Sequence, residues 1–293
     1  KSCFPRIHEV ESEYGSLIRG LISLQKAARK AGKKDTPGPG PGGLLTSFRD
    51  GMSVLTDTLT AQLGDRVRFN TTVESLSRSG KQLQLHLAGG GSEEFDAVVL
   101  AAPAWAQAKI LRDMAPAIAA EVAGIEYPAL AVVCMAYDRT RAGDCLDGFG
   151  FLVPSREKRG ILGTVVDSNV FPDRAPEGQV LLRTMVGGAR SSDLAELPED
   201  RLVDLVRSDL ADILGLDADP EFVRVWRHQR AIPQYLVGHP ARLDAIAGEL
   251  ARIHGLFLTG NAYRGVSLND CVLNAARTAR AVAGYRVSGG GKQ

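Results

Sequence analysis

Residues 255–285, which decide the fold, read GLFLTGNAYRGVSLNDCVLNAARTARAVAGY. The apolar run at its start has the length and composition of a buried strand. Gly260 and Gly265 bracket the next segment and predict a turn-forming loop. Ser267 and Asp270 then stand in the S-x-x-D spacing that is typical of a capping box at the start of a helix. The stretch therefore predicts a strand, a glycine loop and a helix in direct succession.

The predicted helix carries its apolar residues on one face, because they recur at three- and four-residue intervals. These residues are Leu268, Val272, Ala275, Ala279 and Val282, and the basic residues Arg277 and Arg280 lie off that face. A helix N-terminus has unpaired N–H groups and a partial positive charge, so it suits an anion such as a dinucleotide pyrophosphate. Spacing alone also fits an ordinary strand–loop–helix unit that closes a domain.

The segment 260–271, GNAYRGVSLNDC, resembles the C-terminal flavin-contacting motif of the oxygen-dependent protoporphyrinogen oxidases, within the amine-oxidase-like flavoprotein family. Further matches occur in the order that this family has them: FPR at 4–6, YGSLI at 14–18, FRDGM at 48–52, GFGFLVP at 148–154 and IPQY-x-x-GH at 232–239. The resemblance covers nearly the whole chain. It implies an α/β plus α+β fold that is the C-terminal part of a two-domain FAD-linked oxidoreductase.

The resemblance also implies site residues, none of which is a catalytic acid or base. Six positions match contacts to the cofactor, FAD, and they are Val73, Trp226, Asn261, Val266, Ser267 and Leu268. Three positions match the apolar residues that hold the tetrapyrrole, and they are Phe149, Leu152 and Met185. Without the resemblance, Val73 reads as an ordinary strand-edge residue, and the three apolar residues read as the core of a sheet. Aromatic and thioether groups suit a flat macrocycle, because they offer contact area without requiring polar partners.

The function implied by the resemblance is the oxidation of a porphyrinogen, protoporphyrinogen IX or coproporphyrinogen III, to the porphyrin in haem biosynthesis, with oxygen as acceptor. A flavin carries such chemistry, so the protein mainly positions and desolvates the substrate. Two family features are absent from the sequence: the N-terminal dinucleotide fold with its glycine fingerprint, and the arginine for a substrate propionate. We therefore expect a fragment that binds FAD weakly or not at all on its own.

Two other interpretations stay open. One is another enzyme of the same superfamily, an amine oxidase or a carotenoid desaturase, against which the FPR and IPQY matches argue. The other is a truncated, non-catalytic module that binds a tetrapyrrole or a partner subunit. The sequence decides neither which porphyrinogen is used nor whether the protein forms a homodimer.

The composition excludes several other classes. The 35 basic and 34 acidic residues give a formal charge of +1 without a basic patch of interleaved aromatic residues, so nucleic acid is not expected as a partner. Cys3, Cys134, Cys145 and Cys271 form no C-x-x-C pair and are interpreted as reduced thiols of an intracellular protein. Without an H-x-x-x-H or G-x-S-x-G motif, we expect no metal site and no acyl-transfer nucleophile.

Residues 8–34 predict a helix or helix pair with an apolar stripe and a basic end. The stripe comprises Tyr14, Leu17, Ile18, Leu21 and Ile22, and the basic cluster comprises Lys26, Arg29, Lys30, Lys33 and Lys34. The cluster suits a solvated helix C-terminus, but it also fits attachment to a membrane surface, which the resemblance supports.

No apolar run approaches the ~20 residues of a spanning helix, so we expect a cytoplasmic protein or one peripheral to the inner face of a membrane. The sequence has neither an initiator Met nor a signal peptide and starts as if cut from a longer chain.

Residues 36–43, TPGPGPGG, satisfy the G-x-G-x-x-G spacing through Gly38, Gly40 and Gly43. A dinucleotide fingerprint requires a preceding strand and a following helix, whereas this stretch follows a lysine-rich segment and has Pro39 and Pro41 inside the glycine pattern. We interpret it as a flexible surface linker.

Periodicity and turn residues give the order of the remaining elements. Helices are expected at 56–63 and 199–214, a hairpin meander over 76–95, and strands at 66–70, 96–103, 129–137, 149–153, 161–166 and 180–186. We expect four parts: 1–43 as a helical substrate- or membrane-associated segment with a linker, 44–106 as part of the FAD domain, 107–232 as an α+β substrate domain, and 233–293 as the return to the FAD domain.

Overall fold

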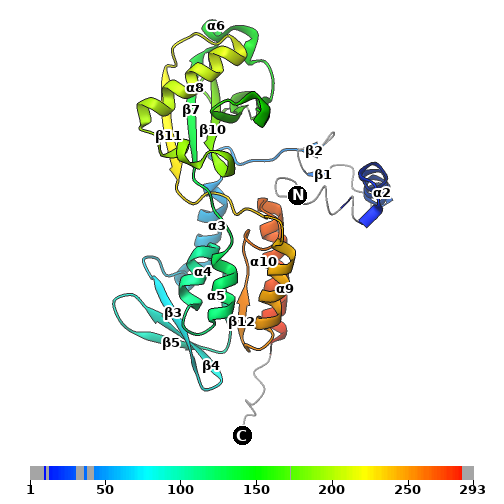
Figure 1. Ribbon diagram of the computed structural model, residues 1–293, viewed down its shortest axis with the longest axis vertical. Helices are drawn as coiled ribbons and strands as arrows, with labels where there is room; N and C mark the ends of the chain where they lie inside the picture. Colours follow the sequence, from blue (N-terminus) through cyan, green and yellow to red (C-terminus); the bar gives the residue numbers. More distant parts are fainter. Residues whose placement is uncertain (1–9, 11–12, 31–35, 38–42, 172, 286–293) are drawn as a thin grey trace. The chain divides into compact units, whose positions relative to one another are not determined.

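The computed structural model describes residue 10 and residues 13–30, 36–37, 43–171 and 173–285 (Figure 1). The described chain divides into two compact units. Unit 1 comprises the described residues of 1–46, 52–126 and 233–293, and unit 2 comprises those of 47–51 and 127–232.

Unit 2 is built on a five-stranded antiparallel sheet in the order β11-β7-β10-β9-β8. Its strands are β7 (Leu130–Asp138), β8 (Gly150–Leu152), β9 (Ile161–Val166), β10 (Gln179–Gly187) and β11 (Phe222–His228). β-Branched and other aliphatic residues dominate these strands, which favours a pleated, half-buried backbone. The first four confirm the strands expected from periodicity within one residue at each end, whereas periodicity does not predict β11.

Helix α8 (Glu199–Leu214) lies across one face of this sheet and confirms the helix expected there (Figure 1). Leu202, Val206 and Leu210 recur at four-residue intervals and are fully buried. They join Val133 and Leu182 of the sheet in one core cluster. This packing uses one face of the sheet and leaves the other face outside the core.

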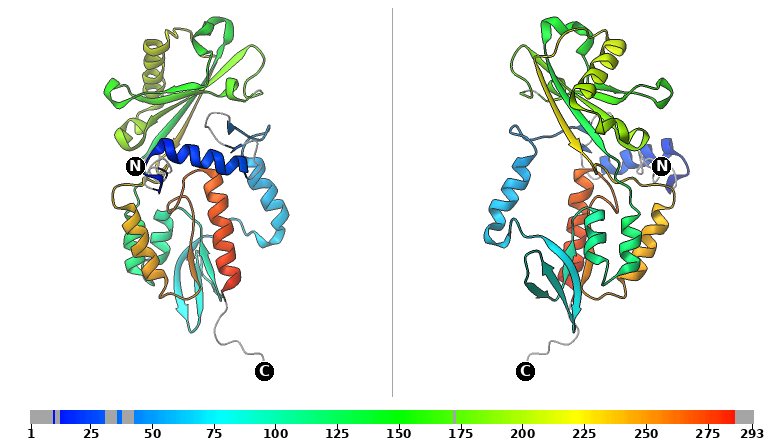
Figure 2. Two further views of the ribbon diagram at one scale, coloured as in Figure 1. Left: turned by 90° about the vertical axis from the view of Figure 1, so that its right-hand side faces the viewer. Right: turned by 60° about the vertical axis from the view of Figure 1, so that its left-hand side comes forward.

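Unit 1 contains a three-stranded antiparallel meander and a separate two-stranded parallel sheet (Figure 2). The meander, which was expected, consists of β3 (Val73–Ser79), β4 (Gln82–Leu87) and β5 (Ser92–Phe95), and the parallel pair consists of β6 (Val98–Leu100) and β12 (Leu256–Leu258). The helices of this part are α4 (Ala104–Leu111), α5 (Pro116–Ala123), α9 (His239–Leu250) and α10 (Leu268–Gly284). Helix α4 packs on β3 and α5, and α5 packs on α9.

The remaining described elements are short or lie in the first 66 residues. They are α2 (Leu17–Lys30), β1 (Thr36–Pro37), β2 (Gly43–Leu44), α3 (Ser53–Leu63), η1 (Gly64–Arg66), α6 (Arg139–Ala142), η2 (Gly143–Leu146), η3 (Ser155–Glu157), α7 (Asp167–Val170), η4 (Gly188–Arg190) and η5 (Ser192–Glu196). The helix expected at 56–63 thus begins three residues earlier, as α3.

The N-terminal segment bears on three sequence predictions. Helix α2 falls within the helical stretch expected at 8–34, while Lys33 and Lys34 of its basic cluster lie outside the described residues. The short strands β1 and β2 pair in parallel at the two ends of the stretch interpreted as a linker, and residues 38–42 between them are not described. Within the described ranges, no helix combines the length and the apolarity needed to cross a bilayer.

Two expected strands are corrected. Residues 66–70 form no strand, because Arg66 ends η1 and Asn70 adopts a φ of 53°, a left-handed conformation that a strand does not contain. Residues 96–103 contribute only the three-residue strand β6, and Val99 at its centre is 41% exposed. This strand is therefore buried on one face.

The boundary between the two compact units also differs from the expected start of the substrate domain. The substrate domain was expected to begin at 107, but α4 and α5 pack on β3 and α9 and so fall within unit 1. Unit 2 instead starts at Tyr127 and includes residues 47–51, whose Ser47 hydroxyl and Phe48 carbonyl accept hydrogen bonds from Arg174 at 2.7 and 2.9 Å.

The packing face predicted for helix α10 is wrong. None of its residues is buried, and Val272 of the predicted apolar face is 58% exposed. Its half-buried positions lie on a different face, at Asp270, Cys271, Asn274, Thr278 and Val282. The periodicity thus predicts the helix correctly. Of the residues on the predicted apolar face, only Val282 lies on the side that packs on the rest of unit 1. Among the described residues, Cys134, Cys145 and Cys271 form no disulfide, and Cys3 lies outside those residues.

Candidate cofactor and substrate sites

A row of five residues crosses the sheet of unit 2 on the face away from α8. Leu152 lies opposite Gly163, Gly163 opposite Met185, Met185 opposite Val132, and Val132 opposite Trp226. Directly opposed residues of antiparallel strands point to the same face of a sheet. The two ends of the row are open to solvent, since Leu152 is 74% exposed and Trp226 is 53% exposed. We call these five residues the apolar row.

Glycines hold strand β8 close to strand β9 at this row. A Cβ on Gly163 would lie 2.5 Å from the carbonyl oxygen of Phe151, and a Cβ on Gly150 would lie 2.2 Å from the carbonyl oxygen of Thr164. Neither contact is sterically allowed, so any side chain at these positions would push the strands apart. Gly150 and Gly163 therefore fix the position of Leu152 on the sheet.

The apolar row contains three of the residues predicted from sequence. They are the predicted substrate contacts Leu152 and Met185 and the predicted cofactor contact Trp226. Phe149 lies apart from them, because it precedes β8 and its carbonyl accepts the N–H of Val166. The alternative interpretation of these residues as sheet core does not fit the exposed Leu152, nor Phe149, which is also exposed.

A buried glutamine of α4 holds the loop between β12 and α10. The side chain of Gln107 is fully buried, and its Nε2 donates to the carbonyl oxygens of Ala102 at 2.6 Å and Thr259 at 3.1 Å. Its Oε1 accepts a hydrogen bond of 2.5 Å from the hydroxyl of Tyr263. Because Ala102 follows β6 and Thr259 follows β12, this side chain joins the ends of both parallel strands to the loop.

A stacked pair of rings fixes the same loop at two further points. The rings of Tyr235 and His239 stack with centroids 4.2 Å apart. The Tyr235 hydroxyl donates to the carbonyl of Asn261 at 2.5 Å, and His239 Nε2 lies 3.2 Å from the carbonyl oxygen of Tyr263. Burial lowers the pKa of His239, the hydrogen bond to Tyr263 opposes this shift, and Arg242 reinforces it. The imidazole is therefore neutral near pH 7, and its Nε2 carries the donated proton.

Helix α10 begins at a capping box, as predicted. Ser267 Oγ accepts the N–H of Asp270 at 3.1 Å and donates to the carboxylate of the same residue at 2.6 Å. Gly265 adopts a φ of 75°, and a Cβ there would lie 2.4 Å from the Asp270 side chain. The N–H groups of Leu268 and Asn269 have no acceptor within the helix, by the geometry of a helix start. Since the capping carboxylate is itself anionic, this terminus suits a neutral ring with carbonyl groups better than a pyrophosphate.

The loop and the helix start therefore fit one part of a flavin cofactor. Val266 and Leu268 are exposed and offer apolar contact beside the free N–H groups. Asn261 is half-buried, and its main chain is fixed by Tyr235. The structure thus brings four predicted cofactor contacts, from Asn261 to Leu268, into one segment that is positioned by hydrogen bonds.

Val73 lies elsewhere in unit 1, at the start of β3. The ladder between β3 and β4 shifts its register between Val73 and Ser75, as at a β-bulge or another irregularity of the pairing. A bulge releases backbone groups from regular pairing. This local geometry is compatible with the backbone contact that the resemblance implies for Val73.

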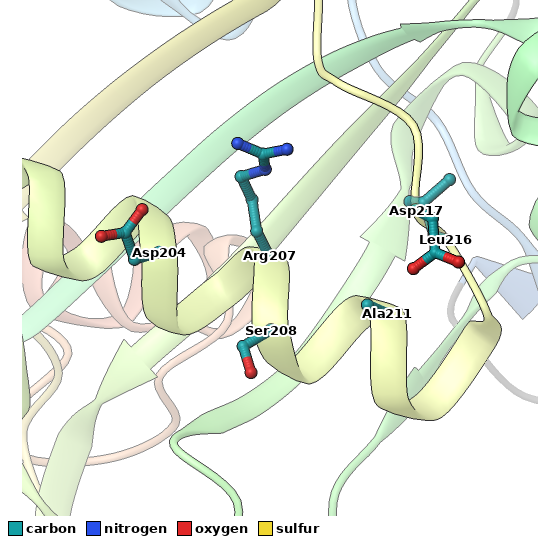
Figure 3. Close-up of a pocket in the computed structure, with 6 residues that line it drawn as sticks. All are labelled: Asp204, Arg207, Ser208, Ala211, Leu216 and Asp217. Atoms are coloured by element: carbon teal, nitrogen blue, oxygen red, sulfur yellow. The ribbon is translucent and has the colours of Figure 1, made fainter.

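A shallow hollow on unit 2 contains none of the predicted residues. It is lined by Asp204, Arg207, Ser208, Ala211, Leu216 and Asp217, from α8 and the segment after it (Figure 3). Its one cation, the guanidinium of Arg207, forms an ion pair with Asp219. Because α8 covers the face of the sheet opposite to the apolar row, we do not assign this hollow to the candidate site.

Sequence reasoning missed the residues that position the cofactor loop. A signal was present for Tyr235 and His239, since both belong to the IPQY-x-x-GH match, but the motif alone gives them no role. Gln107 had no signal, because a single glutamine within a helical pattern is most often exposed. Val132 and Gly163 were missed because only the register across the sheet places them in the row.

A strand–loop–helix element with free N–H groups at the helix start, accompanied by an antiparallel sheet with an apolar face, is compatible with the class of FAD-linked oxidoreductases. The chain belongs to the family described as flavin containing amine oxidoreductase, whose model matches residues 1–283. This finding confirms the fold class inferred from the resemblance and, with it, FAD as the cofactor of the family.

Individual relatives are porphyrinogen oxidases. The chloroplastic protoporphyrinogen oxidase of Oryza sativa subsp. japonica is 33% identical over 307 residues, covering 97% of this chain and 56% of the relative. The coproporphyrinogen III oxidase of Bacillus subtilis (strain 168) is 28% identical over 273 residues, covering 92% of this chain and 57% of the relative.

A solved structure agrees with these relatives. A crystal structure from Exiguobacterium sp. 255-15, provisionally named a protoporphyrinogen oxidase, has a TM-score of 0.76 at 26% identity and covers 95% of this chain and 58% of that one. The chain therefore spans somewhat more than half the length of these relatives.

Proposed function

We propose that this chain is the substrate-binding and flavin-ring-binding portion of an FAD-dependent oxidase that converts a porphyrinogen to the porphyrin, with oxygen as the electron acceptor. The observation that carries the proposal is the apolar row of unit 2. Leu152, Met185 and Trp226 offer an aliphatic, a thioether and an indole surface along one line of the sheet. A flat tetrapyrrole needs such a surface, because its ring has a large apolar area.

The residues of the row bind and orient the ring but exchange no protons with it. The row consists of Leu, Gly, Met, Val and Trp, so it holds no side chain that titrates near neutral pH. Its role is to exclude water from one face of the substrate. Bound FAD would supply the hydride acceptor, and the segment from Asn261 to Leu268 would hold its ring through main-chain N–H groups and apolar contacts.

The direct test is the production of fluorescent porphyrin in air by flavin-loaded protein expressed from the whole reading frame that contains this chain. Protoporphyrinogen IX and coproporphyrinogen III are offered separately. We expect fluorescence to rise with at least one of them, faster than in protein-free controls. Met185→Asp should abolish the rise, because it places a charge in the row. If flavin-loaded protein leaves both porphyrinogens unoxidised, the proposal is wrong.

We also propose that the chain works as a fragment of a larger flavoprotein. The exposed apolar side of α10 and the two-stranded sheet of β6 and β12 support this, because parallel sheets are normally covered on both faces and wider than two strands. The isolated chain should therefore bind FAD weakly or not at all. Quenching of flavin fluorescence at micromolar chain concentrations would contradict this expectation.

A second candidate is a module that binds a tetrapyrrole without turning it over. The exposed apolar face of α10 favours this candidate, because it indicates that the cofactor domain of unit 1 is incomplete. The apolar row belongs to unit 2, so it would still bind a tetrapyrrole when no cofactor is held. Porphyrin binding by a flavin-loaded protein that oxidises neither porphyrinogen would favour this candidate over the oxidase.

Peripheral membrane contact and dimerisation are further parts of the proposal. In α2, Ile18 and Ile22 are exposed near the exposed Lys26, a combination that suits the surface of an anionic bilayer. Cosedimentation with anionic vesicles, lost in Ile18→Asp, tests the contact. Sedimentation equilibrium of the same protein tests whether it forms a homodimer.

A further inference from the structure

A second row of residues lies beside the apolar row on the same face of the unit 2 sheet. In β11, Arg224 stands two residues before Trp226, so both side chains point to this face. Arg224 lies opposite Cys134, and Cys134 lies opposite Arg183. Two arginines therefore flank β7, about 7 Å along the strands from the apolar row.

The two arginines differ in their partners. Arg183 donates from Nε and Nη2 to the two carboxylate oxygens of Asp167, at 2.9 Å each, so its charge is neutralised. Arg224 lies over the ring of Trp226, with its Cζ 4.9 Å from the ring centroid. This contact orients a guanidinium without neutralising it. No salt bridge joins Arg224 to a carboxylate in the part of the chain that the structure describes.

The residue between the arginines adds no competing charge. Burial raises the pKa of the Cys134 thiol, Asp167 raises it further, and Arg183 opposes the shift. The thiol is therefore neutral near pH 7. Because Asp167 is paired with Arg183, its carboxylate is also compensated, and this part of the face has one uncompensated cation, at Arg224.

We propose that Arg224 binds a carboxylate of the tetrapyrrole whose ring lies on the apolar row. This assignment rests on the function proposed above and adds the polar half of the site. An apolar ring that bears carboxylate side chains at its edge matches both rows at once. The planar guanidinium presents paired donors to a carboxylate, and the ring of Trp226 keeps the guanidinium in place beside the ligand.

The test compares a free porphyrin acid with its methyl ester, which has the same ring and no carboxylate. The full chain is titrated with protoporphyrin IX and with its dimethyl ester in the same detergent-containing buffer, and binding is followed by porphyrin fluorescence. Arg224→Gln should raise the Kd of the acid about tenfold, the effect of one charge-assisted pair, and leave the Kd of the ester unchanged. Arg224→Lys should restore part of the affinity, since it keeps the charge and loses the planar fork.

Two further variants make the outcome specific. Arg201 is an exposed residue of α8, on the covered side of the sheet, so Arg201→Gln removes the same charge and should change neither Kd. Trp226→Ala should weaken both ligands, because it shortens the apolar row. If Arg224→Gln weakens acid and ester equally, or weakens neither while Trp226→Ala weakens both, the carboxylate assignment is overturned and the proposed function stands. If the wild-type chain binds neither porphyrin, both fall together.

Discussion

Helices α8 and α10 are amphipathic and nearly equal in length, 16 and 17 residues, yet they differ in how far their side chains are buried. Helix α8 buries Leu202, Val206 and Leu210 against a five-stranded sheet. Helix α10 has no fully buried residue, because β12 before it belongs to a sheet that has two strands in the described part of the chain. An apolar helix face is thus buried only where the adjoining sheet is wide enough to cover it.

The same comparison separates two ways of holding a site in place. The apolar row of unit 2 is held in place by the apolar core that packs on the opposite face of the same sheet. The cofactor loop of unit 1 is fixed by polar side chains, chiefly Gln107, Tyr235 and His239. Truncation of buried apolar side chains should therefore lower the stability of unit 2 most. Removal of side-chain hydrogen bonds should disturb the cofactor loop most.

The largest difference is expected between core substitutions in the two units. Leu182→Ala removes a fully buried side chain of unit 2 and should lower its free energy of unfolding by about 2–5 kcal/mol. Val272→Ala removes a mostly exposed side chain of α10 and should change stability by no more than about 0.5 kcal/mol. Urea denaturation followed by circular dichroism measures both. Equal losses would mean that α10 is packed as tightly as the core of unit 2.

The second effect concerns the buried glutamine. Gln107→Ala leaves the Tyr263 hydroxyl and two carbonyl groups without their present partner, so unit 1 should lose about 2–3 kcal/mol. Hydrogen exchange should rise in the loop 259–264 and stay unchanged in β9 and β10 of unit 2. Gln84→Ala serves as the control, because Gln84 is a half-buried glutamine of the meander whose amide donates to Ser92 instead of to the loop. Unchanged exchange in the loop would contradict its anchoring by Gln107.

The third effect tests the close contact of β8 and β9. Gly163→Ala should destabilise unit 2 by about 1–3 kcal/mol and displace Leu152, because the new Cβ meets the carbonyl of Phe151. Gly248→Ala in α9 is the matched control: a Cβ there meets nothing within 4 Å, and alanine favours the helix. If Gly163→Ala leaves both stability and porphyrin binding unchanged, the glycine does not determine the shape of the row.

The smallest effect is a pH dependence of unit 1. Because burial lowers the pKa of His239, the unfolded chain takes up this proton first as the pH falls through about 6.5. The unfolded state then binds more protons, so stability should fall until the pH passes below the folded-state pKa. His239→Gln should flatten this slope in urea denaturation between about pH 5 and 7. An identical slope in the variant would assign the dependence to other groups.

The sequence predicts what depends on neighbours along the chain. The capping box of Ser267 and Asp270, the bounds of α8 and the turns of the meander all follow from local spacing. The orientation of α10 does not, because its packing side depends on how much sheet lies beside it. The apolar row was also beyond prediction as a unit, because Val132 and Trp226 become neighbours only through the pairing of β7 with β11.

The most direct test of the central claim is an anaerobic titration of protein expressed from the whole reading frame that contains this chain. Oxidised-flavin absorption is recorded while protoporphyrinogen IX, coproporphyrinogen III and, as a control, a simple amine are added in turn. We expect the flavin bands to bleach with at least one porphyrinogen and to persist with the amine. Flavin bands that persist with both porphyrinogens, or a protein that takes up no flavin, would contradict this claim.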